Sequence, residues 1–97
     1  MRRSKLEIFV DILTVLALRG PLKLTHVMYK ANVNCCILRE YLQFLIEKGL
    51  VAEKSVGKRR VVYAITQKGI VILKQFKELK QVLPIEEESQ KQLSSLF

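Results

Sequence analysis

Two groups of side chains have types and spacings suited to a defined chemistry. Asn34, Arg39 and Gln43 follow one another along a predicted helix, and Lys58–Arg60 are three consecutive cations. An arginine can form two hydrogen bonds with a guanine edge, a glutamine can do the same at adenine, and clustered cations attract phosphates. Together these residues predict recognition of a nucleic acid.

Each group also has a simpler interpretation. Arg39 could pair with neighbouring glutamates on a solvated helix face, and Lys58–Arg60 could form a solvated turn. Three adjacent cations repel one another unless an anion lies nearby, which favours phosphate contact. Lys30 could hold the nucleic-acid backbone as well, and so could a basic N-terminal segment that contains Arg2, Arg3 and Lys5.

Residues for catalysis or metal binding do not form a set. His26 is the only histidine, and Cys35 and Cys36 are adjacent, so no zinc-ligand spacing occurs. A nucleophile–base pair, a glycine-rich phosphate loop and paired carboxylates are missing too. We expect no enzyme activity, metal or cofactor. The two thiols should stay reduced. They are either small packing residues or, because Cys35 is on the predicted DNA-binding face, a site where oxidation changes DNA affinity.

Charge and size narrow the class of partner. The chain has 97 residues, enough for one core, and a net charge of +8 with a pI of about 9.8. Residues 1–83 hold 16 basic and six acidic residues, whereas residues 84–97 hold one lysine and three glutamates. A polyanion partner follows. No apolar run approaches the roughly 20 residues of a membrane span and no signal peptide is recognisable, so we expect a cytoplasmic, nucleoid-associated protein.

Three helices are predicted to position the candidate residues. The first begins after Ser4 as N-cap, runs to about Leu18, and ends at Gly20 and Pro21. A short helix from His26 to about Lys30, capped by Thr25, is followed by one that Asn34 caps and Gly49 ends. The apolar stripe of this third helix is Leu38, Leu42 and Leu45, with Asn34, Cys35, Arg39 and Gln43 opposite. The pair forms a helix-turn-helix.

After the third predicted helix, the spacing of apolar residues changes from that of a helix to that of a strand. Leu50–Val56 and Arg60–Thr66 are predicted strands joined at Gly57 and Lys58, which places the three cations at the tip of a β-hairpin wing. Thr66 caps a fourth helix from Gln67 to about Leu83. Its apolar residues form a narrow seam that consists of Ile72, Phe76, Leu79 and Leu83.

These elements predict an α+β, mostly α winged helix-turn-helix fold with three helices, a two-stranded wing and a C-terminal helix. We expect a DNA-binding domain at 1–66, the C-terminal helix packed on it at 67–83, and an acidic tail or short helix at 84–97. Tyr29 and Tyr41 are expected to cover the core between the second and third helices.

The sequence also resembles a known family. The segment Thr25–Val33, with Arg39–Leu42, Gly49–Val51 and Ile65–Gly69, is similar to small archaeal winged-helix DNA-binding proteins. These include ten-kilodalton chromatin-associated proteins and winged helix-turn-helix transcription regulators. The resemblance covers roughly residues 2–83 and implies DNA binding through the third helix and the wing. It also implies a homodimer through the last helix, with the seam Ile72, Phe76, Leu79 and Leu83 as the dimer interface. Pro84 shortens what is a long coiled-coil helix in the chromatin-associated relatives.

Three hypotheses about function remain. The first is a transcription regulator that reads double-stranded DNA as a homodimer, with the third helix in the major groove and the wing on the backbone or minor groove. The second is an architectural chromatin protein that coats DNA through phosphate contacts alone. The third is a winged-helix module that binds an acidic protein partner.

Overall fold

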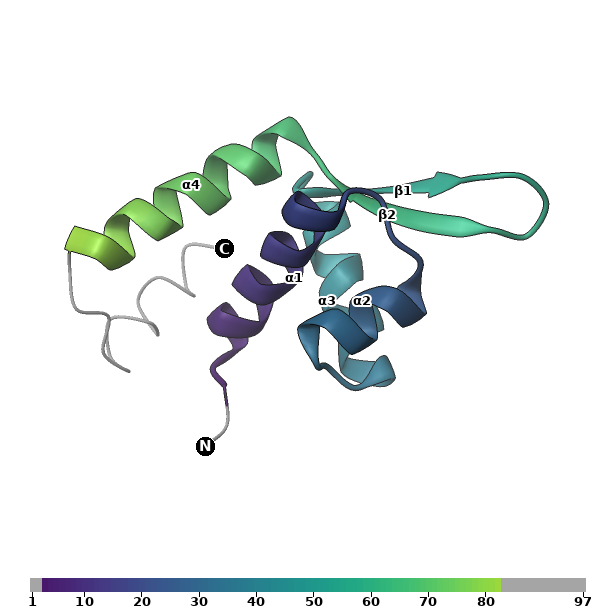
Figure 1. Cartoon of the computed structure of the whole chain (residues 1–97), viewed down its shortest axis with the longest axis horizontal. Coiled ribbons are helices and arrows are strands. Elements are labelled where there is room, and N and C mark those ends of the chain that lie inside the picture. Colours follow the sequence, from purple (N-terminus) through teal and green to yellow (C-terminus); the bar gives the residue numbers. More distant parts are fainter. Residues whose placement is uncertain (1–2, 83–97) are drawn as a thin grey trace.

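The computed structural model describes residues 3–82, which form four helices and one hairpin. The order is α1 (Lys5–Arg19), α2 (Leu24–Ala31), α3 (Cys35–Glu47), β1 (Val51–Ser55), β2 (Val61–Ile65) and α4 (Gln67–Val82). Figure 1 shows that the hairpin and α4 extend in opposite directions from the body formed by α1, α2 and α3. The predicted element order and the mostly α fold are confirmed. In this part of the chain, no helix is both long and apolar enough to cross a membrane.

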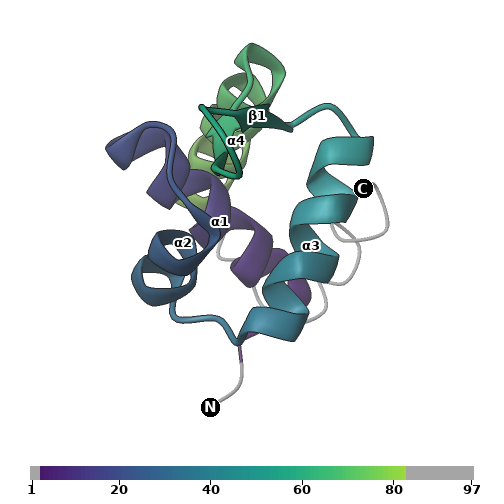
Figure 2. The same cartoon turned by 90° about the vertical axis from the view of Figure 1, so that its right-hand side faces the viewer.

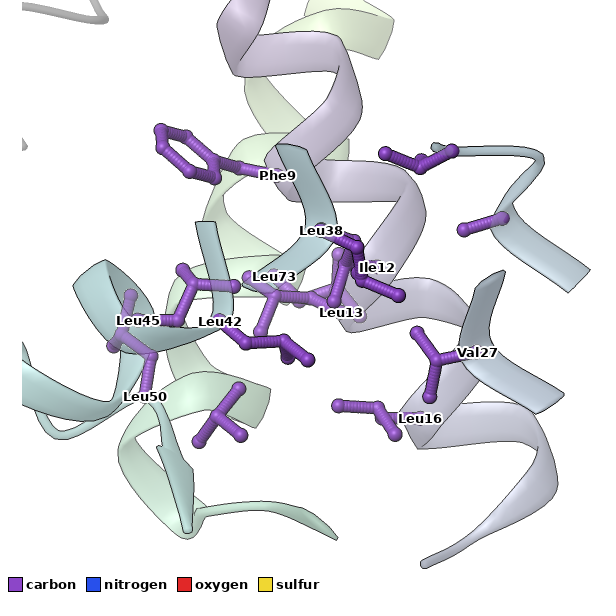
Figure 3. Packing of buried hydrophobic residues seen from close by; sticks show 13 residues of the cluster. Phe9, Ile12, Leu13, Leu16, Val27, Leu38, Leu42, Leu45, Leu50 and Leu73 are labelled. Atoms are coloured by element: carbon purple, nitrogen blue, oxygen red, sulfur yellow. The ribbon is translucent and has the colours of Figure 1, made fainter. Parts of the chain in front are cut away.

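The core lies between α1, α2, α3 and the first half of α4. Leu38, Leu42 and Leu45 of α3 are at most 1% exposed, which confirms the predicted stripe. They face side chains of α1 and Leu73 of α4 (Figure 3). The spacing of apolar residues at three and four positions along α1 predicts that Ala17 is buried as well, but it is exposed, because α1 packs only as far as Leu16.

Of the three N-caps predicted for α1, α2 and α3, two are confirmed. Ser4 and Glu7 form a capping box at α1, and the Asn34 side chain accepts hydrogen bonds from the N–H groups of Cys36 and Ile37 at α3. The predicted Thr25 cap is wrong. The second helix already starts at Leu24, after an extended Lys23 that makes no side-chain cap, because Leu22 is held in a β-bridge to Tyr63.

The hairpin is antiparallel, with Val51 opposite Ile65 and Ser55 opposite Val61. Its loop closes with a hydrogen bond from the Val56 N–H to the Arg60 carbonyl at 2.8 Å. Gly57 and Arg59 both have positive φ angles, 68° and 65°. The predicted tip is therefore confirmed, but the turn includes Arg59 in a left-handed conformation rather than Gly57 and Lys58 alone.

The fourth helix is fixed to the base of the hairpin. The Thr66 hydroxyl accepts a hydrogen bond from the Gly69 N–H at 3.0 Å, which confirms the predicted cap, and donates one to the Gly49 carbonyl at 2.7 Å. The Thr66 N–H bonds to the Leu50 carbonyl at 3.0 Å. Gly69 is buried against the Leu50 backbone, where a side chain has no room.

Candidate nucleic-acid interface

The exposed side of α3 carries the predicted reading residues. Arg39 and Gln43 are exposed, and within residues 3–82 Arg39 makes no ion pair within 4.0 Å. The Gln43 amide donates to the Glu47 carboxylate at 3.4 Å, a long contact that a base edge could replace. Figure 2 shows α3 along one side of the molecule, with its length unobstructed by α1 or α2.

Two of the predicted contact residues on α3 are less available for DNA contact than Arg39 and Gln43. Asn34 is exposed, but its carboxamide oxygen is already bonded to the Cys36 and Ile37 N–H groups at 2.8 and 3.2 Å. Cys35 is half-buried, and Cys36 is the exposed thiol of the pair. The Asn34 side chain is used to cap the start of α3. Arg39 and Gln43 are therefore the predicted residues of α3 that remain available to contact bases.

The wing presents an exposed cationic tip. Lys58, Arg59 and Arg60 are all exposed, and Lys54 on β1 is exposed beside them. None of these four makes an ion pair to an acidic group within the described residues. Since Figure 1 shows the hairpin projecting beyond the helical body, its tip can reach a partner that lies against α3.

A tyrosine in the middle of β2 lies among charged side chains of β1 and α3. Tyr63 of β2 lies opposite Glu53 of β1. Burial raises the pKa of the Tyr63 hydroxyl, the Glu53 carboxylate raises it further, and the positive charge of Arg39 lowers it. Arg39 is therefore within electrostatic range of this hydroxyl, as expected from the packing of α3 against β1. The Tyr63 hydroxyl stays protonated at neutral pH and remains a hydrogen-bond donor.

The second helix adds two exposed side chains. Lys30, in its last turn, is exposed as predicted for a backbone contact. Tyr29 is 77% exposed, so the expectation that it covers the core is wrong. Its position on the eight-residue α2 points away from the buried Val27 and Ala31, which are the two residues that fix the inner face. Tyr41, by contrast, is half-buried against Phe9, with ring centroids 4.8 Å apart.

The N-terminal cations support the helix-turn-helix instead of extending from it. Arg3 pairs with Asp11 at 2.7 Å and donates to the carbonyl oxygens of Ala31, at 2.7 Å, and Asn32. The Lys5 ammonium lies 5.6 Å from the centre of the Tyr41 ring. Arg3 thus holds the end of α2, where helix carbonyls lack partners, instead of extending toward a duplex. Arg2 lies outside the described residues.

Replacing Arg3 with alanine should destabilise the domain by about 1 to 3 kcal/mol, since hydrogen bonds to a charged group are lost and two carbonyls lose their donor. Asp11→Ala should cost less, because Arg3 keeps both carbonyl contacts. Urea unfolding of the two variants and of the double variant measures the difference. Equal losses in both single variants would show that the carbonyl contacts contribute nothing.

The predicted dimer seam on α4 is partly used by the protein's own core. Phe76 is 8% exposed and Ile72 packs against the core, while Leu79 is half-buried. Leu83 lies outside the described residues. An exposed apolar residue on this helix is Val71, at 44%. The seam spacing therefore reflects packing within the chain at Ile72 and Phe76.

Two residues at this surface were missed by the sequence analysis. The electrostatic influence of Arg39 on Tyr63 could not be predicted from the sequence, because it depends on how α3 packs on the hairpin. Glu40 could have been found. It is exposed, and counting 100° per residue from the buried Leu38 and Leu42 places it directly opposite the core.

Three helices followed by a hairpin and a C-terminal helix define a winged helix-turn-helix domain. A family model described as winged helix-turn-helix matches residues 2–83, and the chain belongs to this family. The crystal structure of Sso10a-2, a DNA-binding protein from Sulfolobus solfataricus, is similar, with a TM-score of 0.69 and 26% identity over 98% of this chain and 97% of that one. The predicted resemblance to small archaeal winged-helix proteins is confirmed.

Two bacterial structures share the fold at lower identity. One is the PcaV transcriptional regulator from Streptomyces coelicolor in complex with its natural ligand, with a TM-score of 0.67 and 18% identity over 91% and 68% of the two chains. The other is BpsR from Bordetella bronchiseptica, whose DNA binding is regulated by 6-hydroxynicotinic acid. Its TM-score is 0.67, with 15% identity over 92% of this chain and 74% of that one. Among curated proteins, no sequence is detectably similar.

Proposed function

We propose that this protein binds double-stranded DNA as a homodimer and regulates transcription. Arg39 and Gln43 of α3 contact base edges in the major groove, and Lys58, Arg59 and Arg60 contact the backbone or the adjacent minor groove. Lys30 contacts a phosphate beside α3. The activity is binding without chemistry.

One observation carries the proposal: the reading helix α3 packs directly against β1 of the cationic hairpin. Arg39 of α3 is exposed and is free of ion pairs within residues 3–82. The wing tip is exposed and unpaired over the same range. A major groove about 12 Å wide admits a helix, and a neighbouring cationic hairpin then meets phosphates. The Sso10a-2 relative is itself a DNA-binding protein.

The dimer is proposed through α4. Val71 and Leu79 offer apolar surface, and a two-fold axis would pair the two reading helices on a palindromic site. Because Phe76 and part of Ile72 are already covered, the seam on residues 67–82 alone is short.

Selection from a random duplex library at two salt concentrations tests the proposed function. A regulator enriches a palindromic site and binds it about 10³-fold or more tightly than random duplex. An architectural protein shows a steep salt dependence without a preferred site. A protein that binds no duplex at either salt concentration would refute both and leave the interaction-module hypothesis.

Replacing Arg39 with alanine should weaken binding to the selected site by about 5- to 150-fold, the equivalent of about 1 to 3 kcal/mol for a bidentate base contact. Base preference should relax at one position in each half-site. Arg39→Lys keeps the charge but not the planar fork, so it should lose most of the preference while keeping affinity for random duplex. A loss that is equal on all duplexes would show that Arg39 contacts only phosphate.

A further inference from the structure

The outermost stripe of α3 differs in charge from the rest of the surface around it. Leu38, Leu42 and Leu45 are buried and fix the inner face. At 100° per residue, the residues opposite them lie at intervals of four, three and four. All are exposed: Cys36, Glu40, Gln43 and Glu47. The stripe contains two carboxylates and no lysine or arginine.

This stripe is unsuited to phosphate binding. A carboxylate brought to the surface of a duplex is repelled by the phosphates, and it also loses water. Within residues 3–82, Glu40 makes no ion pair within 4.0 Å that would neutralise it. Three adjacent cations lie at the wing tip, at Lys58–Arg60, whereas the charged residues of the outermost stripe of α3 are acidic. A protein that held DNA only by phosphate contacts would gain nothing from Glu40.

The base edges of the major groove offer a carboxylate few partners. A carboxylate only accepts hydrogen bonds, and the donors available there are the amino groups of cytosine and adenine. Adenine carries its N7 acceptor beside the amino group. The lone pair of N7 would face the second carboxylate oxygen and repel it. Cytosine carries an apolar C5–H at the corresponding position. A carboxylate therefore favours cytosine and is repelled by the acceptor atoms of guanine and thymine.

We propose, as an extension of the proposed DNA-binding function, that Glu40 is a specificity-determining residue that accepts a hydrogen bond from the N4 amino group of a cytosine in the major groove. Glu40 also excludes sites that lack an amino group at this position, because its charge would then be left without a partner.

Glu47 shares the stripe but not the role. It is the last residue of α3, about two turns beyond Glu40, and it accepts the hydrogen bond from Gln43 at 3.4 Å. The N-terminal part of a recognition helix is the part that contacts base edges. Glu47 therefore supplies a matched control, with the same charge on the same face of the same helix.

The test compares Glu40→Gln and Glu47→Gln with the unmodified chain, on the site selected from random duplexes and on variants of that site. We expect one C·G pair per half-site to be required by the unmodified protein, with T·A in its place weakening binding about tenfold or more. An amide can accept from cytosine N4 or donate to thymine O4. Glu40→Gln should therefore bind both sites within a few-fold, and its affinity for random duplex should rise. Glu47→Gln should keep the full preference for C·G.

The results separate the two proposals. If the unmodified protein selects a site and Glu40→Gln keeps the same preference at every position, the assignment of Glu40 is wrong while the DNA-binding function stands. If the unmodified protein binds all duplexes equally or none of them, the assignment and the proposed regulator both fail. Both substitutions are at exposed positions, and circular dichroism spectra that match the unmodified chain confirm that each variant is folded.

Discussion

Charge reversal at the wing tip, Arg59→Glu with Arg60→Glu, is expected to abolish binding to duplex DNA at physiological salt. Both side chains are exposed at the end of the hairpin and are unpaired within the described residues. The change replaces two phosphate attractions with two repulsions. Affinity should fall by more than about 100-fold, and the dependence of log K on log salt should become shallower by about two, since each phosphate contact contributes a slope of about −0.9. Fluorescence anisotropy with a labelled duplex at several salt concentrations measures both.

A matched control changes the same net charge elsewhere. Lys74→Glu with Lys77→Glu alters two exposed residues of α4, and Lys74 lies on the side opposite Phe76. Long-range electrostatics alone would weaken both double variants to a similar degree, and such a result would contradict a specific role for the wing. We expect the α4 variant to lose less than about tenfold in affinity, because charges beyond a Debye length of roughly 8 Å are screened.

Gly69→Ala is expected to destabilise the domain, because the new side chain would clash with backbone. An added methyl group would lie closer to the Leu50 carbonyl oxygen than the sum of their van der Waals radii, and 2.7 Å from the Ile65 Cγ1 atom. The Leu50 carbonyl also accepts the Thr66 N–H that joins the hairpin to α4, so it cannot move freely. Overpacking against backbone costs about 1 to 3 kcal/mol or more. We expect a net destabilisation of about 2 kcal/mol, seen as a lower midpoint in urea unfolding.

Helix propensity alone predicts the opposite sign for this change. Alanine is favoured over glycine by about 1 kcal/mol within a helix. A Gly69→Ala variant as stable as the unmodified chain, or more stable, would show that α4 can move away from the hairpin base at little cost. Gln75→Ala, at an exposed position of the same helix, should change stability by less than about 0.5 kcal/mol.

Features that depend on neighbours along the chain were predictable. Ser4, Asn34 and Thr66 cap their helices as expected, because a cap bonds to N–H groups two or three residues away. The apolar period of α3 identified its inner face for the same reason. Thr25 failed as a cap because a distant contact decided the outcome: the bridge between Leu22 and Tyr63 extends the chain up to Lys23.

The candidate site was predictable in its location but not in its detail. Arg39 and the wing tip could be assigned from residue type and order, whereas the commitment of Arg3 to Asp11 and the end of α2 joins residues eight and 28 positions apart. The spacing of Ile72 and Phe76 fits both a dimer seam and the protein's own core, and sequence periodicity cannot distinguish these two uses. The burial of Phe76 within the single chain shows that part of the seam belongs to the core.

The central claim is that α3 and the wing form one DNA-binding surface. An NMR titration of the 15N-labelled protein with the selected duplex tests this most directly, because each amide reports its own surroundings. We predict that the amides of Arg39, Glu40 and Gln43 and those of Gly57–Arg60 shift together, at the same DNA concentration. Shifts confined to α1 and α4, with α3 and the hairpin tip unchanged, would contradict the claim.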